Sequence, residues 1–272
     1  MSSSAPSTEK AKNDRALRFY RDALGLERLH YGMWLPDDEL TMEALKAAQK
    51  RYEDFLIDSI PEGTRRVIDV GCGTGELCLH LKARGYEVEG LSPDINQKKM
   101  FAEKVEARFH FTKFEDSQLE GGYDLIIMSE SCQYIPLDKV FEVAQQALNP
   151  RGYLMVCDYF VLDQNAGELS KSGHDYNEFL KKAEESAFEI VSRRDITLDI
   201  RKTLEIADEW AEKILLGADI LTEKFRERNP FLWKIVKWFG ISKYEKLLSQ
   251  KVLIDADKFC AFKKYEFLLF QL

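Results

Sequence analysis

Three glycines at alternating positions, Gly71, Gly73 and Gly75, are the residues most suited to chemistry in this chain of 272 residues. They follow Val67–Val70, whose β-branched residues predict a buried strand, and they precede Glu76–Arg84, whose leucines predict a helix. A strand that turns through glycines into a helix brings bare backbone N–H groups close to a ligand. The pattern therefore predicts a nucleotide-type cofactor site, with a tight turn that binds nothing as the plainer interpretation.

The spacing of these glycines distinguishes between two classes of cofactor. The dinucleotide fingerprint, G-x-G-x-x-G, needs its third glycine one position later, where Glu76 stands. Asp69 also lies within the strand, two residues before the first glycine. The segment Val67–Gly75 resembles motif I of the class I S-adenosylmethionine (SAM)-dependent methyltransferases, hydrophobic-hydrophobic-Asp-hydrophobic-Gly-x-Gly-x-Gly, at every position. A nucleotide-dependent oxidoreductase stays open as an alternative that the glycine spacing disfavours.

The resemblance, which covers most of the chain from His30 onward, implies that SAM binds and leaves as S-adenosylhomocysteine. It also implies that the three glycines pack against the methionine portion and that Asp69 helps to hold it. Ser92 replaces the acid that usually grips the ribose, and Gln97 fits a variant of the family that uses a serine and a glutamine. The other residues implied at the cofactor are the lid residue Tyr31, one or more of Phe114, Glu115 and Asp116 beside the adenine, and Ser129 near the sulfonium.

Methyl transfer from a sulfonium is an in-line displacement, so the protein mainly positions the acceptor and excludes water. A base is needed only where the acceptor must lose a proton. His174, in a polar loop after the fifth predicted strand, is the best candidate base, against the alternative of a solvent-exposed loop histidine. By the resemblance, Glu130 falls near the sulfonium, and Tyr134 replaces a histidine of many relatives. Because Gln133 replaces the glutamate that binds bicarbonate in cyclopropane synthases, the sequence disfavours cyclopropanation.

The composition argues against several other classes of protein. A formal net charge of −8 and a pI near 5.3 argue against a nucleic-acid partner, which needs a basic surface. No apolar run reaches transmembrane length, and the serine-rich start, Met1–Lys12, lacks the apolar stretch of a secretory signal. Five scattered cysteines without a C-x-x-C pair, and four histidines without ligand spacing, predict reduced thiols, a cytoplasmic location and no metal site.

Alternating strand and helix patterns must position these residues. This alternation predicts an α/β fold with a doubly wound sheet and ligands at the carboxyl ends of its strands. The resemblance implies a Rossmann-like sheet of seven strands with the last strand antiparallel. The predicted strands are Val67–Val70, Tyr86–Leu91, Ala107–Phe111, Tyr123–Ser129, Tyr153–Asp158, Phe188–Arg193 and Tyr265–Phe270. The predicted helices are Glu76–Arg84, Asp94–Lys104, Leu137–Leu148, Tyr176–Ser186 and one from near Asp38 to Pro61.

A helical block, residues 201–250, has no place in the minimal doubly wound pattern and is predicted to be an insertion before the final strand. The predicted organisation is a disordered tail (1–15), a SAM-binding domain (16–200 and 251–272) and this insertion, which caps the acceptor site. The apolar stripe Phe231–Phe239, with Trp233 and Trp238, is predicted either as core or as the wall of an apolar pocket. Lysines within the stripe also permit peripheral membrane contact.

The sequence therefore predicts a SAM-dependent methyltransferase that acts on a small, hydrophobic or amphipathic acceptor. By resemblance it falls in the small-molecule subgroup, which includes cyclopropane-fatty-acid-synthase-like, tocopherol and alkaloid N-methyltransferases. The main alternative is a SAM-fold protein that transfers another group or only binds, because Ser92, Lys113 and Tyr134 depart from the family pattern. The acceptor atom and the oligomeric state stay open.

Overall fold

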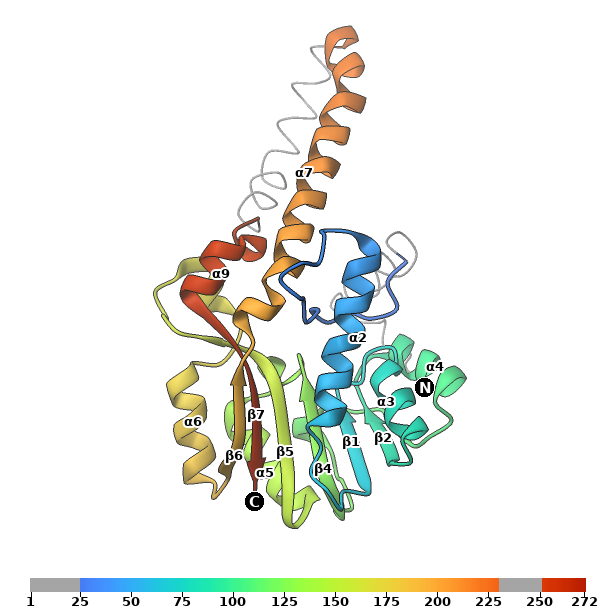
Figure 1. The fold of residues 1–272 in the computed structure, drawn as a ribbon, viewed down its shortest axis with the longest axis vertical. Coiled ribbons are helices and arrows are strands. Elements are labelled where there is room, and N and C mark those ends of the chain that lie inside the picture. Colours follow the sequence, from blue (N-terminus) through green and yellow to red (C-terminus); the bar gives the residue numbers. More distant parts are fainter. Residues whose placement is uncertain (1–24, 230–250) are drawn as a thin grey trace, which may run out of the picture.

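A seven-stranded sheet is the centre of residues 25–229 and 251–272, the part of the chain that this computed structural model describes (Figure 1). The strand order is β3-β2-β1-β4-β5-β7-β6. β7 is antiparallel to both of its neighbours, whereas the other paired strands are parallel, which confirms the predicted Rossmann-like sheet. The strands are β1 (Arg66–Val70), β2 (Glu87–Leu91), β3 (Phe109–His110), β4 (Tyr123–Ser129), β5 (Leu148–Val161), β6 (Glu189–Asp195) and β7 (Lys263–Gln271).

Helices pack on both faces of the sheet. One face is covered by α2, α3, α4, α9 and the start of α7, and the other by α5 and α6. Figure 1 shows the rest of α7 extending far beyond the sheet. The helices are α2 (Met42–Asp58), α3 (Glu76–Ala83), α4 (Ile95–Lys104), α5 (Leu137–Ala147), α6 (Tyr176–Glu185), α7 (Thr197–Arg228) and α9 (Ala256–Phe262).

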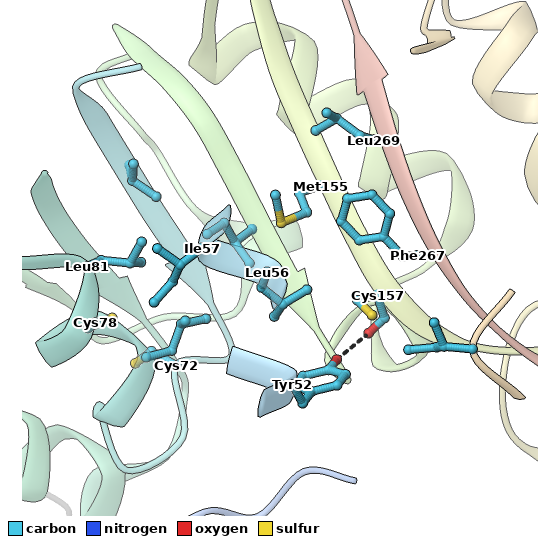
Figure 2. Packing of buried hydrophobic residues seen from close by; sticks show 14 of the residues in the cluster. Tyr52, Leu56, Ile57, Cys72, Cys78, Leu81, Met155, Cys157, Phe267 and Leu269 are labelled. Carbon is cyan, nitrogen blue, oxygen red and sulfur yellow. Dashed lines mark hydrogen bonds between the residues drawn. The ribbon is translucent and has the colours of Figure 1, made fainter. Parts of the chain in front are cut away.

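Two hydrophobic clusters, one on each face, hold these layers together. Val67 of β1 belongs to the cluster beneath α2 and α3, and its neighbour Ile68 belongs to the cluster beneath α5 and α6. A strand buried on both faces reads as a continuous apolar run, which is why Val67–Val70 was recognisable in the sequence. Figure 2 shows part of the first cluster, where Tyr52 of α2 donates its hydroxyl hydrogen to the Cys157 carbonyl at 3.4 Å.

The carboxyl ends of the parallel strands meet at one edge of the sheet. Because β7 is antiparallel, its first residues lie at this same edge, with Lys263 opposite Val161 at the end of β5. Loops that follow β1, β2, β4 and β5 therefore meet the start of β7. This edge is where doubly wound folds bind their ligands.

Several predicted boundaries differ from the structure. α2 begins at Met42 rather than near Asp38, because the Thr41 hydroxyl accepts the Ala44 N–H at 3.1 Å and caps the helix there. α7 begins at Thr197, before the predicted insertion at residue 201, so one helix continues from the sheet domain into that block. The predicted tail (1–15) and the stripe Phe231–Phe239 lie outside the described residues. Among the helices that are described, none is both long and apolar enough to span a membrane.

Candidate cofactor and acceptor site

The loop between β1 and α3 adopts a backbone that glycine permits at all three motif positions. Gly71, Gly73 and Gly75 have φ angles of 78°, 53° and 85°. A Cβ on Gly71 would collide with the Ser131 side chain, and one on Gly75 would lie 2.9 Å from Val105 Cγ2. A Cβ on Gly73 would meet no atom of the described residues within 4 Å. The outer two glycines are thus needed for packing, whereas Gly73 presents its backbone to open space.

Asp69 lies at the buried side of this loop, two residues before the first glycine. Its side chain is 3% exposed and accepts a hydrogen bond from Cys78 Sγ at 3.3 Å. Burial raises the pKa of Asp69 to about 7. A cationic group placed against this carboxyl would restore its ordinary ionisation, so the position suits the ammonium end of an amino-acid ligand.

The predicted ribose contacts follow β2. The Ser92 hydroxyl accepts the Asp94 N–H at 3.1 Å, and Asp94, rather than Ser92, caps α4 by accepting the N–H groups of Asn96 and Gln97. The Ser92 hydroxyl therefore stabilises the turn just before the helix and does not cap the helix itself. Gln97 Oε1 is buried without a hydrogen-bond donor among the described residues. A ligand hydroxyl is the kind of donor that this oxygen needs.

The predicted adenine residues have unequal surroundings. Phe114 is 2% exposed and belongs to the cluster beneath α5, whereas Glu115 is half-buried and lies 3.6 Å from Lys113 Nζ. Phe111 is 42% exposed directly after β3, with the Lys98 ammonium 5.1 Å from its ring centroid. Phe111 is therefore an aromatic surface at this rim that sequence reasoning missed. The adenine role of Phe114 and Glu115 stays a prediction.

At the end of β4, Glu130 collects contacts from distant segments. Its Oε1 accepts the Tyr31 N–H and the Tyr265 hydroxyl, each at 2.7 Å. The Tyr52 hydroxyl lies 2.9 Å from Ser129 Oγ and 3.1 Å from the Tyr265 hydroxyl. Burial raises the pKa of Glu130, although nearby His30 and the two hydrogen bonds oppose the shift. Three predicted residues, Tyr31, Ser129 and Glu130, thus meet at one point of the sheet edge.

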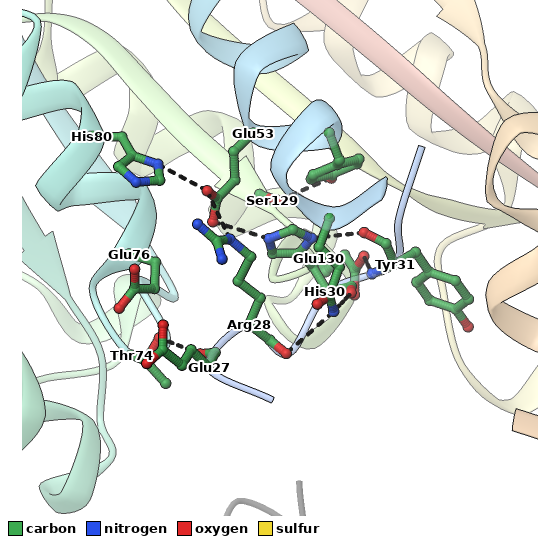
Figure 3. A network of polar contacts seen from close by, with 12 residues as sticks. Glu27, Arg28, His30, Tyr31, Glu53, Thr74, Glu76, His80, Ser129 and Glu130 are labelled. Carbon is green, nitrogen blue, oxygen red and sulfur yellow. Dashed lines mark hydrogen bonds and ion pairs between the residues drawn. The ribbon is translucent and has the colours of Figure 1, made fainter. Parts of the chain in front are cut away.

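Residues 25–35, here called the N-terminal strap, cross this edge from the motif I loop to β4. The Thr74 hydroxyl donates to the Glu27 carbonyl at 2.8 Å, which ties the strap to the glycine loop. Figure 3 shows Glu53 of α2 at the centre of the contacts with Arg28 (2.9 Å), His30 (3.2 Å) and His80 (2.9 Å). Tyr31 is therefore held at the end of β4 by its bond to Glu130, and its role as a lid residue stays a prediction.

Charge explains why Glu53 is tolerated at 1% exposure. Burial alone would raise the pKa of Glu53, but the hydrogen bond from His30 and the charge of Arg28 lower it below its ordinary value. Burial likewise disfavours a charged His30 ring, yet its hydrogen bond to Glu53 and the charge of Glu130 raise the pKa of His30. The strap is thus bound to α2 through a buried ionic group.

The two remaining catalytic candidates lie on the loops after β4 and β5. Tyr134 is 76% exposed. His174 is half-buried, with Nε2 3.0 Å from the Cys132 carbonyl and its ring stacked on Phe179 at 5.8 Å. Because a carbonyl only accepts, Nε2 carries the proton and Nδ1 is the nitrogen left with a lone pair. Burial lowers the pKa of His174, which favours this neutral ring. Its role as a base stays a prediction.

Sequence reasoning missed Glu53, Tyr52 and Tyr265, which hold the strap and Glu130 in place. A carboxylate beside Tyr52 on the apolar face of α2 was a signal for Glu53, because an unpaired charge is seldom buried. Tyr265 sits in an apolar strand and gave no signal of its own. Within residues 25–229 and 251–272, no group of three or more His, Cys, Asp or Glu side chains could hold a metal ion.

The family description "Methyltransferase domain" matches residues 42–197, more than half of the chain. The chain belongs to this methyltransferase family. The match spans the glycine loop, Asp69 and the end of β4, so the predicted family is confirmed for the segment that carries the predicted cofactor residues other than Tyr31.

Known proteins agree with this assignment at the level of sequence and fold. The tuberculostearic acid methyltransferase UfaA1 of Mycobacterium tuberculosis is 28% identical over 118 residues, which cover 40% of this chain and 27% of that protein. The chain thus matches about a quarter of that relative's length. The ubiquinone biosynthesis O-methyltransferase of Rickettsia typhi is 24% identical over 200 residues, covering 65% of this chain and 80% of that protein.

A solved structure shares the fold over almost the whole chain. The crystal structure of the [4+2]-cyclase SpnF has a TM-score of 0.71 with 17% identity, and the superposition covers 99% of this chain and 97% of that one. At this identity the likeness concerns the fold alone. Since its name describes a cyclase, the fold by itself does not determine which reaction takes place at the sheet edge.

Proposed function

We propose that this protein transfers a methyl group from SAM to a small, partly apolar acceptor. The observation that carries the proposal is the motif I loop: Gly73 alone of its three glycines would direct a Cβ into open space. Asp69 at the base of the loop and Gln97 in the first turn of α4 offer polar groups that a ligand would satisfy. When bound, SAM supplies an activated methyl group on a sulfonium. The chain's own task is to bind, orient and exclude water.

Each part of the site has a proposed role in that task. Asp69 binds the ammonium end of the cofactor, and Ser92 with Gln97 faces the ribose. Glu130 fixes the strap over the sulfonium by accepting the Tyr31 N–H. This cover excludes water from the transfer. His174 and Tyr134 stand on the loops that border the acceptor side, where a proton leaves an O- or N-directed acceptor.

The acceptor is proposed to be apolar or amphipathic. The rings of Tyr31, Tyr159 and Phe259 gather beside Glu130 and offer an aromatic wall. The two curated relatives are named for tuberculostearic acid and for ubiquinone biosynthesis, both of which concern hydrophobic molecules. A cytoplasmic location, no nucleic-acid partner and no metal stay predictions from the composition.

Peripheral membrane contact is a further proposal for the part of α7 that extends from the body. Ile214, Leu216 and Ile220 are each more than half exposed there. Exposed aliphatic side chains on a projecting helix suit contact with a lipid surface that supplies an apolar acceptor.

A non-methyl reaction on the same fold is the second candidate. This candidate stays open because the chain shares its fold with a protein that is named as a cyclase. Product analysis separates the two: a methyltransferase yields a methylated acceptor and S-adenosylhomocysteine in equal amounts, whereas the alternative yields neither.

The glycine loop provides the test of SAM binding. In Gly73→Val the side chain enters the space where backbone must approach the ligand, so we expect calorimetry to show at least a hundredfold loss of SAM affinity. Gly63→Val is the matched control, because Gly63 also has a positive φ (85°) and open space, but lies in the turn before β1 at the opposite sheet edge. Unchanged SAM affinity in Gly73→Val contradicts the assignment.

A further inference from the structure

Lys263, the first residue of β7, is a buried cation at the ligand-binding edge of the sheet. Its side chain is 3% exposed. It lies opposite Val161, on the same face of β7 as Tyr265, whose hydroxyl donates to Glu130. Because side chains alternate along a strand, Lys263 points to the face that carries the strap and α9, not to the face beneath α5.

The contacts of Lys263 Nζ are all neutral. It donates to the Ser172 carbonyl at 3.1 Å and to the Ser172 hydroxyl at 3.0 Å, and it lies 3.9 Å from the centroid of the Tyr159 ring. No carboxylate of the described residues lies within ion-pair distance of it. Burial lowers the pKa of Lys263 to about 8, with the charge of Asp158 opposing the shift. Asp158 acts on Lys263 only from beyond ion-pair distance, and a buried ammonium without a direct carboxylate contact is costly and calls for a closer anion.

Lys264, the next residue of β7, is paired with carboxylates and provides a comparison. Lys264 is 22% exposed and lies 3.1 Å from Glu266 and 3.7 Å from Asp195. It therefore has two carboxylate partners, on the opposite face of β7. Lysines of this strand can therefore find carboxylate partners, and the lack of one is particular to Lys263 and its place at the sheet edge.

Aromatic rings link Lys263 to the end of β4. Tyr159 packs against Phe259 at 5.8 Å, Phe259 against Tyr31 at 6.1 Å, and Tyr31 against Tyr265 at 5.5 Å. This chain of rings leads from the ammonium to Glu130, where the strap covers the site. An acceptor that reaches the sulfonium thus has an apolar wall beside it and a cation at the far end.

We propose that Lys263 binds the carboxylate of an amphipathic acceptor whose apolar part packs against Tyr31, Tyr159 and Phe259. The inference rests on the proposed function and names the acceptor class for that same site. A single ammonium balances a single negative charge, which fits a carboxylate better than a phosphate dianion. Ser172 holds the ammonium in place, and movement of Tyr31 with the strap gives the acceptor its entry.

The test uses the full chain saturated with S-adenosylhomocysteine and three matched probe pairs: hexanoate and hexanol, dodecanoate and dodecanol, cinnamate and cinnamyl alcohol. Calorimetry measures the preference of each variant for the acid over its alcohol. We expect the wild type to bind at least one acid roughly tenfold more tightly than its alcohol, as one charge-assisted contact provides. Lys263→Met removes this preference, and the control Lys264→Met keeps it.

The outcomes separate this inference from the function on which it rests. A wild type without any acid preference, or a preference that persists in Lys263→Met, overturns the role of Lys263. If Lys263→Met does not fold, Ser172→Ala takes its place in the test, and we expect it to reduce the preference for the acid severalfold. An unchanged preference in Ser172→Ala also contradicts the role of Lys263. Failure of the wild type to bind S-adenosylhomocysteine overturns the methyltransferase proposal instead, and the probe pairs measured without it still decide the role of Lys263.

Discussion

At the scale of single residues, buried ionisable groups gather at the carboxyl edge of the sheet. Asp69 on β1 and Asp158 on β5 are 3% and 1% exposed, and burial raises the pKa values to about 7 and about 8. Such groups cost stability when ionised, so their presence needs a reason. Asp158 has a structural one, because it accepts the N–H groups of Gln133 and Tyr159. Among the described residues, Asp69 accepts a hydrogen bond from Cys78 alone, and we propose ligand binding as the reason for its burial.

Asp69→Asn tests this distinction. The folded-state pKa of Asp69 is raised, so the wild type loses stability as pH rises from about 4 to about 7, and the cost is complete above that range. Relative to the wild type, Asp69→Asn should therefore gain about 2 kcal/mol between pH 5 and pH 8. SAM should bind at least tenfold more weakly, because the neutral amide cannot pair with an ammonium. Denaturant melts and calorimetry measure both quantities.

Asp158→Asn is the matched control for that experiment. It should show a similar pH trend in stability, since the pKa of Asp158 is also raised by burial, and its SAM affinity should stay within about twofold of the wild type. The ligand role of Asp69 is refuted if Asp69→Asn binds SAM as well as the wild type does.

The sequence could predict those site residues that come with a local pattern. The glycine loop and Asp69 lie within nine consecutive residues, so a single segment shows their relation. Lys263 lies close to Ser172 only because β7 inserts beside β5, which joins residues 91 positions apart. No local pattern encodes such a contact, so Lys263 could not be identified before the fold was known.

At the scale of elements, the strap is the segment whose attachments are most unusual. Its N-terminal half binds the glycine loop and Glu53, and its C-terminal half binds α7. The Thr203 hydroxyl accepts the Gly32 N–H at 3.0 Å and the Trp34 Nε1–H at 2.8 Å. Trp34 is 4% exposed and packs with Leu45 and Ile206 in a small cluster of its own. One hydroxyl thus links the strap to the helix that leads into the predicted insertion.

Thr203→Val removes this acceptor while keeping the shape of the side chain. Two buried N–H groups lose their partner, which costs about 2 kcal/mol and should raise amide exchange of the strap roughly thirtyfold. Hydrogen exchange with mass spectrometry measures the effect. Thr112→Val is the control, because its hydroxyl bonds only to the neighbouring Lys113 carbonyl. Equal strap protection in the wild type and Thr203→Val would mean that the Thr203 hydroxyl does not hold the strap, and that the Trp34 N–H bond to the Asp199 carbonyl suffices.

Elements with strong periodicity could be predicted, and their ends could not. The predicted strand Tyr123–Ser129 agrees with β4 at both ends, because its apolar residues are buried on both faces. β5 begins at Leu148, five residues before its predicted start, since pairing of Leu148 with Tyr123 extends the ladder through the Asn149–Gly152 turn residues. Hydrogen bonding to a neighbour, not periodicity, fixes that boundary.

At the scale of the whole molecule, one carboxylate joins the four strands on the cofactor side of the sheet. Glu89 of β2 accepts from Arg66 of β1 at 2.8 Å and from the Tyr123 hydroxyl of β4 at 2.7 Å. His110 Nε2 of β3 lies 2.6 Å from Glu89 Oε2, the oxygen that also accepts from Tyr123. The Arg66 guanidinium stacks 4.3 Å from the Tyr123 ring centroid. The glycine loop follows β1 directly, so this network supports the strands from which the cofactor loops emerge.

Glu89→Gln should lower the free energy of unfolding by about 2 kcal/mol at pH 7, because the three contacts lose the negative charge of their acceptor. Burial opposes ionisation of Glu89, but the hydrogen bonds from His110, Arg66 and Tyr123 lower its pKa to about 2. A lowered pKa stabilises the fold above the ordinary value of 4.5, and this stability is lost as pH falls toward 2. The loss of unfolding free energy in Glu89→Gln, measured in urea, should therefore shrink to less than half by pH 3.

Glu87→Gln is the control, because Glu87 lies two residues earlier on the same strand and is exposed; it should show no loss of unfolding free energy. A loss in Glu89→Gln that is equal at pH 7 and pH 3 would mean that the shape of the side chain, and not its charge, holds the four strands together.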